Sequence, residues 1–139
     1  MRRTRKRAAR RKAALRSGTN RRARLSKRFG DFARSNCAVA NLLDLVGDKW
    51  SLLVVRDLFR GHTTYSELLD SPERIPTNIL ADRLKRLERA GVIARAPYRQ
   101  RPIRFSYTLT KRGRDLGDIM VALVRWGKRH VPGTRSFID

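Results

Sequence analysis

The sequence predicts a mainly α-helical fold with one small β-hairpin, and three observations lead to this prediction. Apolar side chains recur at intervals of three and four between residues 36 and 91, which is the helical period. Residues 92–109 alternate with the strand period of two around a turn bounded by two prolines. Residues 110–131 return to the helical period. A chain of 139 residues with 40% hydrophobic content has room for one buried core.

Two helices are predicted first, each ended by a glycine. The first begins near Asn36 and stops at Gly47, and Asp48 is placed to cap the second, which Gly61 closes. The apolar stripe of the first helix consists of Val39, Leu42, Leu43 and Val46. The stripe of the second consists of Trp50, Leu53, Val54 and Leu58. We expect the stripe of the second helix to be buried.

A third, short helix is predicted from a capping box. Thr64 and Glu67 are spaced so that the hydroxyl and the carboxylate each satisfy a backbone N–H at the helix start. We expect Tyr65, Leu68 and Leu69 to reach the core, where the Tyr65 hydroxyl needs water or a hydrogen-bond partner. Residues 70–74 then form a loop to the next helix.

The helix predicted over residues 75–91 is the one around which the chain is organised. Leu80, Leu84 and Leu87 share its apolar stripe, Pro76 suits the first turn, and Gly91 suits the position just past the end. The other face carries Thr77, Asn78, Ala81, Asp82, Lys85 and Arg86. Short, hydrogen-bonding and basic side chains suit a DNA major groove, although an ordinary solvated basic face has the same composition. With the short helix before it, this helix makes a helix-turn-helix.

A β-hairpin is predicted next, with strands over residues 92–96 and 103–109. We expect the prolines at 97 and 102 to bound a basic turn, because proline cannot continue the hydrogen bonding of a strand. Arg99, Arg101 and Arg104 are placed to meet phosphate or to enter a minor groove. A hairpin after a recognition helix is the wing of a winged helix-turn-helix, which is the predicted fold.

One long helix is predicted to close the fold, capped by Thr110 and broken by Pro132 and Gly133. Its apolar stripe consists of Leu116, Ile119, Met120 and Leu123, with Trp126 near the end.

The charge of the chain points to an anionic partner. The chain has 34 Lys and Arg against 12 Asp and Glu, a formal net charge of +22, so nucleic acid is the first candidate and an anionic membrane surface the second. No apolar run approaches the roughly 20 residues that span a bilayer. We expect a soluble, cytoplasmic protein.

Residues 1–30 are predicted to be a disordered tail. They hold 14 of the 34 basic residues and no acid, which leaves 20 basic and all 12 acidic residues, a net of +8, for the rest of the chain. Three interpretations remain open: a nucleic-acid arm, an organelle transit peptide, and a start codon assigned too far upstream.

The sequence offers no catalytic constellation, cofactor motif or metal site. Cys37 is the one cysteine, so an internal disulfide is excluded, and it cannot make a zinc site with only His62 and His130 to help. Neither histidine has a spaced acid or nucleophile, and there is no glycine-rich phosphate loop. We therefore expect a protein that is not an enzyme.

Several motifs together resemble the HxlR-type winged helix-turn-helix regulators of bacteria and archaea. They are Cys37, GDKWSLLVVRDL at 47–58, YSELL at 65–69, IPTNILADRLKRLERAGVI at 75–93 and YTLTKRG at 107–113. The resemblance implies a domain over residues 37–135, a DNA-reading helix over 76–90 and a wing over 98–105. It also implies a homodimer paired through the first and last helices. The tail lies outside the family pattern.

These features predict a sequence-specific DNA-binding transcription regulator. Two-fold symmetry would place the two recognition helices in successive major grooves of an inverted repeat. Asn78, Lys85 and Thr77 are the candidates for base edges, while Lys49 and the wing arginines would position the backbone. The alternative is a non-specific nucleic-acid or nucleoid-associated binder that acts through its tail.

A thiol response is the second function that the resemblance implies. Several family members respond to aldehydes, quinones or thiol oxidation through a cysteine at the position of Cys37, and a helix N-terminus with basic neighbours stabilises a thiolate. The alternative is a small buried thiol that only packs.

Overall fold

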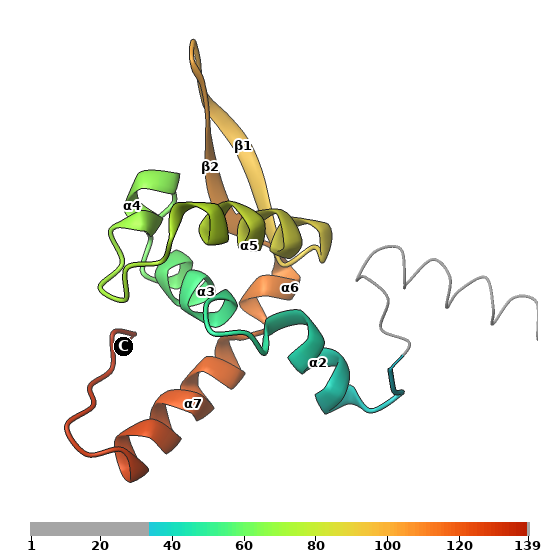
Figure 1. Cartoon of the computed structure of the whole chain (residues 1–139), viewed down its shortest axis with the longest axis vertical. Helices are drawn as coiled ribbons and strands as arrows, with labels where there is room; N and C mark the ends of the chain where they lie inside the picture. Colours follow the sequence, from blue (N-terminus) through green and yellow to red (C-terminus); the bar gives the residue numbers. More distant parts are fainter. Residues whose placement is uncertain (1–33, 139) are drawn as a thin grey trace, which may run out of the picture.

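The computed structural model describes residues 34–138 and forms a helical body from which a hairpin projects (Figure 1). Its helices are α2 (Ala38–Val46), α3 (Ser51–Phe59), α4 (Tyr65–Leu69), α5 (Thr77–Arg89), α6 (Lys111–Arg114) and α7 (Gly117–His130). Its strands are β1 (Ile93–Gln100) and β2 (Ile103–Leu109), paired antiparallel. The predicted tail over residues 1–30 lies outside the described residues.

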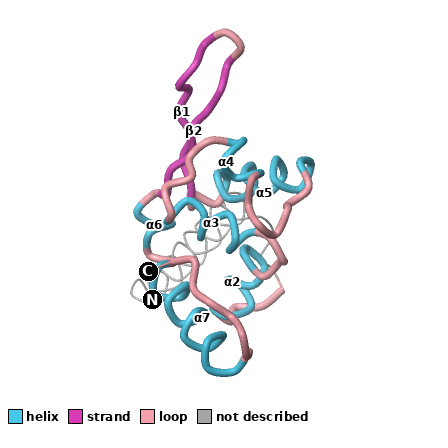
Figure 2. The backbone as a smooth tube through the Cα atoms, turned by 90° about the vertical axis from the view of Figure 1, so that its left-hand side faces the viewer, coloured by secondary structure: helices cyan, strands magenta, loops and turns pink. Residues whose placement is uncertain are grey.

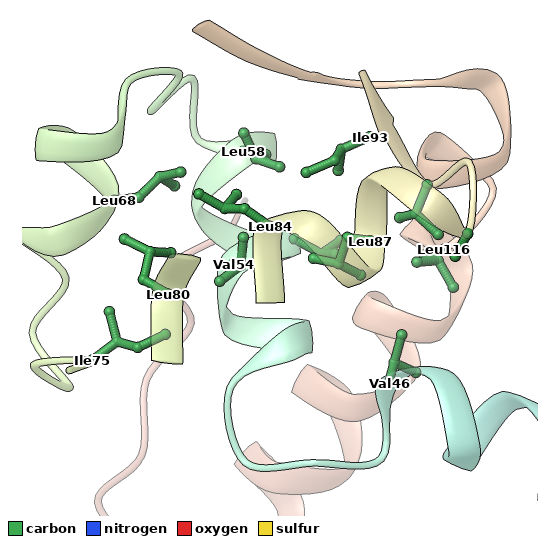
Figure 3. Packing of buried hydrophobic residues seen from close by; sticks show 13 residues of the cluster. Val46, Val54, Leu58, Leu68, Ile75, Leu80, Leu84, Leu87, Ile93 and Leu116 are labelled. Atoms are coloured by element: carbon green, nitrogen blue, oxygen red, sulfur yellow. The ribbon is translucent and has the colours of Figure 1, made fainter. Parts of the chain in front are cut away.

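The core lies where α3, α4 and α5 meet the start of the hairpin (Figure 3). Leu80 and Leu87 are completely buried and Leu84 nearly so, which confirms the predicted inward stripe of α5. Leu68 of α4 packs into the same cluster. The α5 helix therefore has one face fixed in the core and the other exposed to solvent.

The ends of α5 follow its sequence signals, with one difference. Gly91 has φ +71°, its N–H donates to Glu88 O (2.9 Å), and the next N–H, of Val92, donates to Leu87 O (2.9 Å). This is a Schellman motif, as the glycine predicts. Pro76 precedes the helix as its N-cap, with extended backbone, and does not occupy the first turn.

The apolar stripe of α2 is only half covered. Val46 is buried and Leu42 packs against the core, but the exposed fractions of Val39 and Leu43 are 65% and 55%. The helix lies at the edge of the body, so only one side of it is covered (Figure 1). The buried residues of α3 differ from the predicted ones. Val55, Arg56 and Asp57 are buried, whereas Trp50 and Leu53 are only partly covered.

The hairpin is longer than predicted. β1 continues through Pro97 to Gln100, and a register irregularity between Pro97 and Arg99 accommodates the proline. Each strand of a two-stranded ribbon has one edge that pairs with no other strand. A proline whose nitrogen lies on that edge removes no hydrogen bond between the strands. The wing consequently reaches well beyond the body (Figure 2).

The predicted single closing helix is in fact two. Thr110 Oγ1 accepts a hydrogen bond from Gly113 N (3.2 Å) and so caps the short α6, and α7 starts separately at Gly117. Gly113 lies so close to Val92 O that a Cβ atom would be 2.1 Å from it, which fixes α6 against the end of the core. On α7, Leu123 (49% exposed) and Trp126 (62%) lie at the surface.

Candidate nucleic-acid interface

The start of α5 is held by a buried arginine of α3. Arg56 donates from Nη1 to Glu73 Oε1 (2.6 Å) and from Nη2 to Glu73 Oε2 (2.8 Å), a two-pronged pair with the loop that precedes α5. It also donates to Asp57 (2.9 Å) and to Ser71 Oγ (3.1 Å). The arginine lowers the pKa of Glu73 to about 2 against the opposing effect of burial, with a further contribution from Ser71. This network sets the angle at which the chain enters α5.

A second ion pair holds the middle of α5. Arg83 Nε donates to Asp48 Oδ1 (2.9 Å), and Asp48 also accepts from the backbone N–H groups of Trp50 (2.9 Å) and Ser51 (3.0 Å), the capping role that the sequence predicts. Burial alone would raise the pKa of Asp48, but the hydrogen bonds from Ser51, Trp50 and Arg83 outweigh it and bring the pKa to about 2. Arg83 thus ties α5 to the beginning of α3.

One stripe of the outward face of α5 carries side chains that are not engaged in ion pairs of this kind. Asn78, Lys85 and Arg89 are exposed and make no side-chain hydrogen bond or salt bridge with a described residue. Their spacing of seven and four places them on one line opposite the buried leucines. The sequence analysis did not include Arg89 among the candidates for DNA contact. Its position four residues after Lys85 places it on the same face of the helix and could have identified it.

The remaining candidates on α5 differ in their surroundings. Thr77 is exposed beside the hydroxyl of Tyr65, which donates to Thr77 O (2.8 Å) and so has the partner that the sequence required. Ala81 is half-buried, and exposed Asp82 is paired with Arg83. Arg86 is half-buried and donates to Asp44 O (3.2 Å), so its side chain turns toward α2.

The wing is fastened to the helix-turn-helix at its base. Tyr107 N donates to Thr63 O (2.7 Å), and Ser106 forms a β-bridge with Thr64. Thr64 is also the N-cap of α4 in the predicted capping box with Glu67, which is present. Farther along the hairpin, the Arg95 guanidinium of β1 lies 4.3 Å from the ring centre of Phe105 on β2, a cation–π contact across the two strands.

The basic side chains of the wing are exposed toward its tip. Arg99, Arg101 and Arg104 make no salt bridge with a described residue, so all three are available to an anionic partner. Arg99 and Arg104 are paired in register across the two strands. Lys49 is also exposed, with Nζ 5.0 Å from the ring centre of Trp50, at the turn between α2 and α3.

Cys37 lies apart from this surface, at the start of α2. Its thiol is exposed, not buried, and it occupies the N-cap position. Hydrogen bonds from the backbone N–H groups of Ala40 and Val39 lower its pKa, and Arg34 acts in the same direction. These are the conditions that favour a thiolate.

His62 has the Glu67 carboxylate nearby, but that carboxylate already accepts hydrogen bonds from the N–H groups of Thr63 and Thr64. His62 Nδ1 is buried without a hydrogen-bond partner in the described part of the chain, and the His130 ring lies 4.9 Å from that of Trp126. Across residues 34–138 no cluster of three metal-ligating side chains occurs. Over the same residues, none of the helices has the length and apolarity to cross a bilayer.

Comparison with known families gives one match, to the family described as HxlR-like helix-turn-helix, over residues 45–135. A relative named as an HTH-type transcriptional regulator, sll1512 of Synechocystis, is 38% identical over 91 residues, which is 66% of this chain and 67% of the relative. Rv3095 of Mycobacterium tuberculosis, named likewise, is 38% identical over 68% of this chain. The match spans only 60% of the length of Rv3095.

Solved structures of similar proteins share the fold. PA1607, a candidate transcription factor, superposes with a TM-score of 0.65 at 37% identity, covering 74% of this chain and 72% of its own. The HTH-type regulator YtcD gives 0.64 at 34% identity, over 68% of this chain and 97% of its own. The redox regulator HypR in its oxidized form gives a TM-score of 0.62 at 29% identity, over 72% of this chain and 99% of its own.

Proposed function

The chain belongs to the HxlR-like helix-turn-helix family, and on that premise we propose that it is a transcription regulator that binds DNA through α5 and the wing. The observation that carries the proposal is the exposed line of Asn78, Lys85 and Arg89 on a helix whose other face is locked in the core. An amide and two cations, free of internal partners, suit base edges and phosphates. The wing adds three exposed arginines beside the same helix.

Each candidate residue has a role in this proposal. Asn78, Lys85 and Thr77 read base edges, and Ala81 permits close approach of the helix. Lys49, Arg89 and the wing arginines contact phosphate. Asp82 orients Arg83, and Arg86 supports α5 from the side of α2, so we do not count either as a direct contact.

We propose a homodimer paired through α2 and α7. Both helices leave large apolar side chains exposed, and both lie at the end of the molecule opposite the tip of the wing (Figures 1 and 2). Such a dimer would present two α5 helices to an inverted repeat whose half-sites are about one helical turn, or a multiple of it, apart.

The test is a gel shift on DNA that flanks the protein's own gene, with random DNA of equal composition as competitor. Asn78→Ala should abolish the preference for the flanking DNA, because a good bidentate contact provides roughly 1–3 kcal/mol of discrimination. Arg129→Ala, which removes an exposed cation of α7, is the control and should leave the preference intact. Equal binding of all DNA by the unmodified chain would instead favour the non-specific binder that the net charge of +22 supports.

A thiol response through Cys37 is a second element of the proposal. It is supported by the exposure of the thiol, its lowered pKa and its place at the start of a helix assigned to the dimer. Addition of the thiolate to a quinone or an aldehyde would place a bulky group beside α2. Treatment with a quinone should change the DNA affinity of the parent protein and leave that of Cys37→Ser unchanged.

We further propose that the chain acts by binding alone and has no catalytic activity, metal or cofactor. Two observations support this: the Glu67 carboxylate near His62 is engaged in the capping box of α4, and no group of three metal-ligating side chains occurs in the described part of the chain. Turnover of a small molecule that is lost on mutating either histidine would contradict it.

A further inference from the structure

A groove of about 520 Å³ runs along α7 on the side that faces the end of α3. This volume lies in the range of small-molecule pockets. Its walls are Phe59, Gly117, Met120, Val121, Val124, Arg125, Lys128 and Ile138. The last of these belongs to the segment after α7, which folds back along the helix toward α3 (Figure 1).

The lining combines an apolar floor with two cations at one end. Arg125 and Lys128 are three residues apart on α7, so their side chains lie on neighbouring positions of one face. Neither forms a salt bridge within residues 34–138, and the lining contains no acidic residue. The groove is thus complementary to an apolar body that ends in one negative charge.

The groove is on a different side of α7 from the surface assigned to the dimer. Val121 and Val124 face the groove, whereas exposed Leu123 and Trp126 face away from it at helical spacing. Figure 1 shows the C-terminal segment on one side of α7 and α2 on the other. Pairing through α2 and the Leu123 side would leave the groove open.

We propose that this groove binds a small apolar carboxylate, such as a medium-chain fatty acid or an aromatic acid. The apolar part lies on Met120, Val121 and Val124, and the carboxylate accepts hydrogen bonds from Arg125 and Lys128. Resting on the proposed function, the groove is the effector site of the regulator.

The C-terminal segment connects the groove with the support of α5. Phe137, next to the groove residue Ile138, has its ring centre 5.5 Å from the Arg56 guanidinium and 5.6 Å from that of Arg60. Arg56 is the residue that grips Glu73 in the loop before α5. A ligand that moves Ile138 would shift Phe137 against Arg56 and so alter how α5 is held.

Titration calorimetry of the full-length protein with decanoate, below its micelle concentration, tests the binding directly. Decan-1-ol, which has the same chain without the charge, should bind about tenfold more weakly or worse. The double variant Arg125→Gln, Lys128→Gln should reduce decanoate affinity by a similar factor, while Arg129→Gln on the same helix leaves it unchanged. Equal affinity for acid and alcohol, or no effect of the double variant, would overturn the proposal.

A second pair of variants separates the ligand from a second copy of the chain as the occupant of the groove. Val121→Trp fills the groove from its exposed rim and should abolish decanoate binding without changing the oligomeric state, and Leu123→Trp on the other side should leave decanoate binding intact. Dissociation of the dimer by Val121→Trp, with no decanoate binding by the parent, would assign the groove to the partner subunit.

The effector role has its own readout. Decanoate should change the affinity for the flanking DNA in the parent and not in Phe137→Ala, since thermodynamic coupling requires a physical connection between two states. Decanoate binding without any DNA preference would contradict the proposed function and leave the site standing. DNA preference without decanoate binding would contradict the ligand site and leave the proposed function standing.

Discussion

Arg56 and Glu73 show how a single buried charge organises the candidate interface. The exposed fraction of the Arg56 side chain is 7%, and its partners come from α3 itself and from the loop before α5. Removing one partner of such a pair costs more than the pair contributes, because the remaining charge stays buried. Glu73 therefore helps to determine the position of α5 through its pair with Arg56.

Glu73 gives the protein a component of acid sensitivity. Its pKa is about 2 in the folded protein, below the roughly 4.3 of an unfolded chain, so its contribution to stability is present above about pH 4 and is lost as the pH falls toward 2. Glu73→Gln should lower the free energy of unfolding at pH 7 by on the order of 2 kcal/mol. Between pH 5 and 2, as measured by urea unfolding, the variant should then lose less stability than the parent.

The matched variant for this measurement is Asp118→Asn, which removes an exposed carboxylate without a salt bridge in the described residues. It should follow the acid profile of the parent. An unchanged profile in Glu73→Gln would show that the pair with Arg56 does not persist in solution.

Two helical glycines should respond in opposite directions to alanine. At Gly113 a Cβ would be 2.1 Å from Val92 O, so Gly113→Ala forces the backbone apart and should destabilise the protein by about 2 kcal/mol or more. At Gly127 a Cβ meets nothing within 4 Å, and Gly127→Ala should stabilise α7 by about 0.5–1 kcal/mol. Thermal unfolding measures the change in stability of both variants. If the two variants responded alike, α6 could not lie as close to Val92 as the structure has it.

At the scale of the elements, spacings within the sequence predicted most features that lie within a single helix. The Leu80, Leu84 and Leu87 stripe, the Schellman end at Gly91 and the capping box at Thr64 all follow from spacings within one helix. What the period cannot show is which side of a helix the rest of the fold reaches. Val39 and Leu43 follow the helical pattern well, yet they are exposed because nothing in the described chain covers that side of α2.

Contacts between distant segments account for the other differences. The break between α6 and α7 depends on the contact of Gly113 with Val92, which lies 21 positions away in the sequence. The burial of Arg56 depends on Glu73, and the continuation of β1 past Pro97 depends on the free edge of a two-stranded ribbon. For the candidate site, residue types on α5 and the wing could be predicted, but the inward turn of Arg86 could not.

The exposed side of α2 carries a prediction about assembly. Leu43→Asp places a charge in the apolar face assigned to the dimer and should convert the protein to a monomer in sedimentation experiments, because an unpaired buried charge costs several kcal/mol. Val131→Asp alters an apolar residue of similar exposure beyond the end of α7 and should leave the dimer intact. A monomeric parent, or a dimer that tolerates Leu43→Asp, would contradict pairing through α2.

At the scale of the whole molecule, the charge is divided between two parts. The 14 basic residues of the first 30 face no acid in that segment, while the remaining 109 residues carry a net charge of +8. Specific contacts require side chains that the fold places against base edges, and in the described chain the candidates are on α5 and the wing. On the proposed function, we expect the first 30 residues to add affinity for any polyanion and the folded body to add preference for one sequence.

This division predicts how salt affects binding. Each phosphate neutralised contributes about 0.9 to the slope of log K against log salt concentration, so a protein that begins at Asp31 should show a clearly shallower slope than the full chain. It should nevertheless keep the ratio of affinities for the flanking DNA and random DNA, because Asn78 and Lys85 are retained. Fluorescence anisotropy across a salt series measures both quantities. A shallower slope together with a lost ratio would mean that the body alone does not discriminate, and the preference would then have to be sought in the first 30 residues.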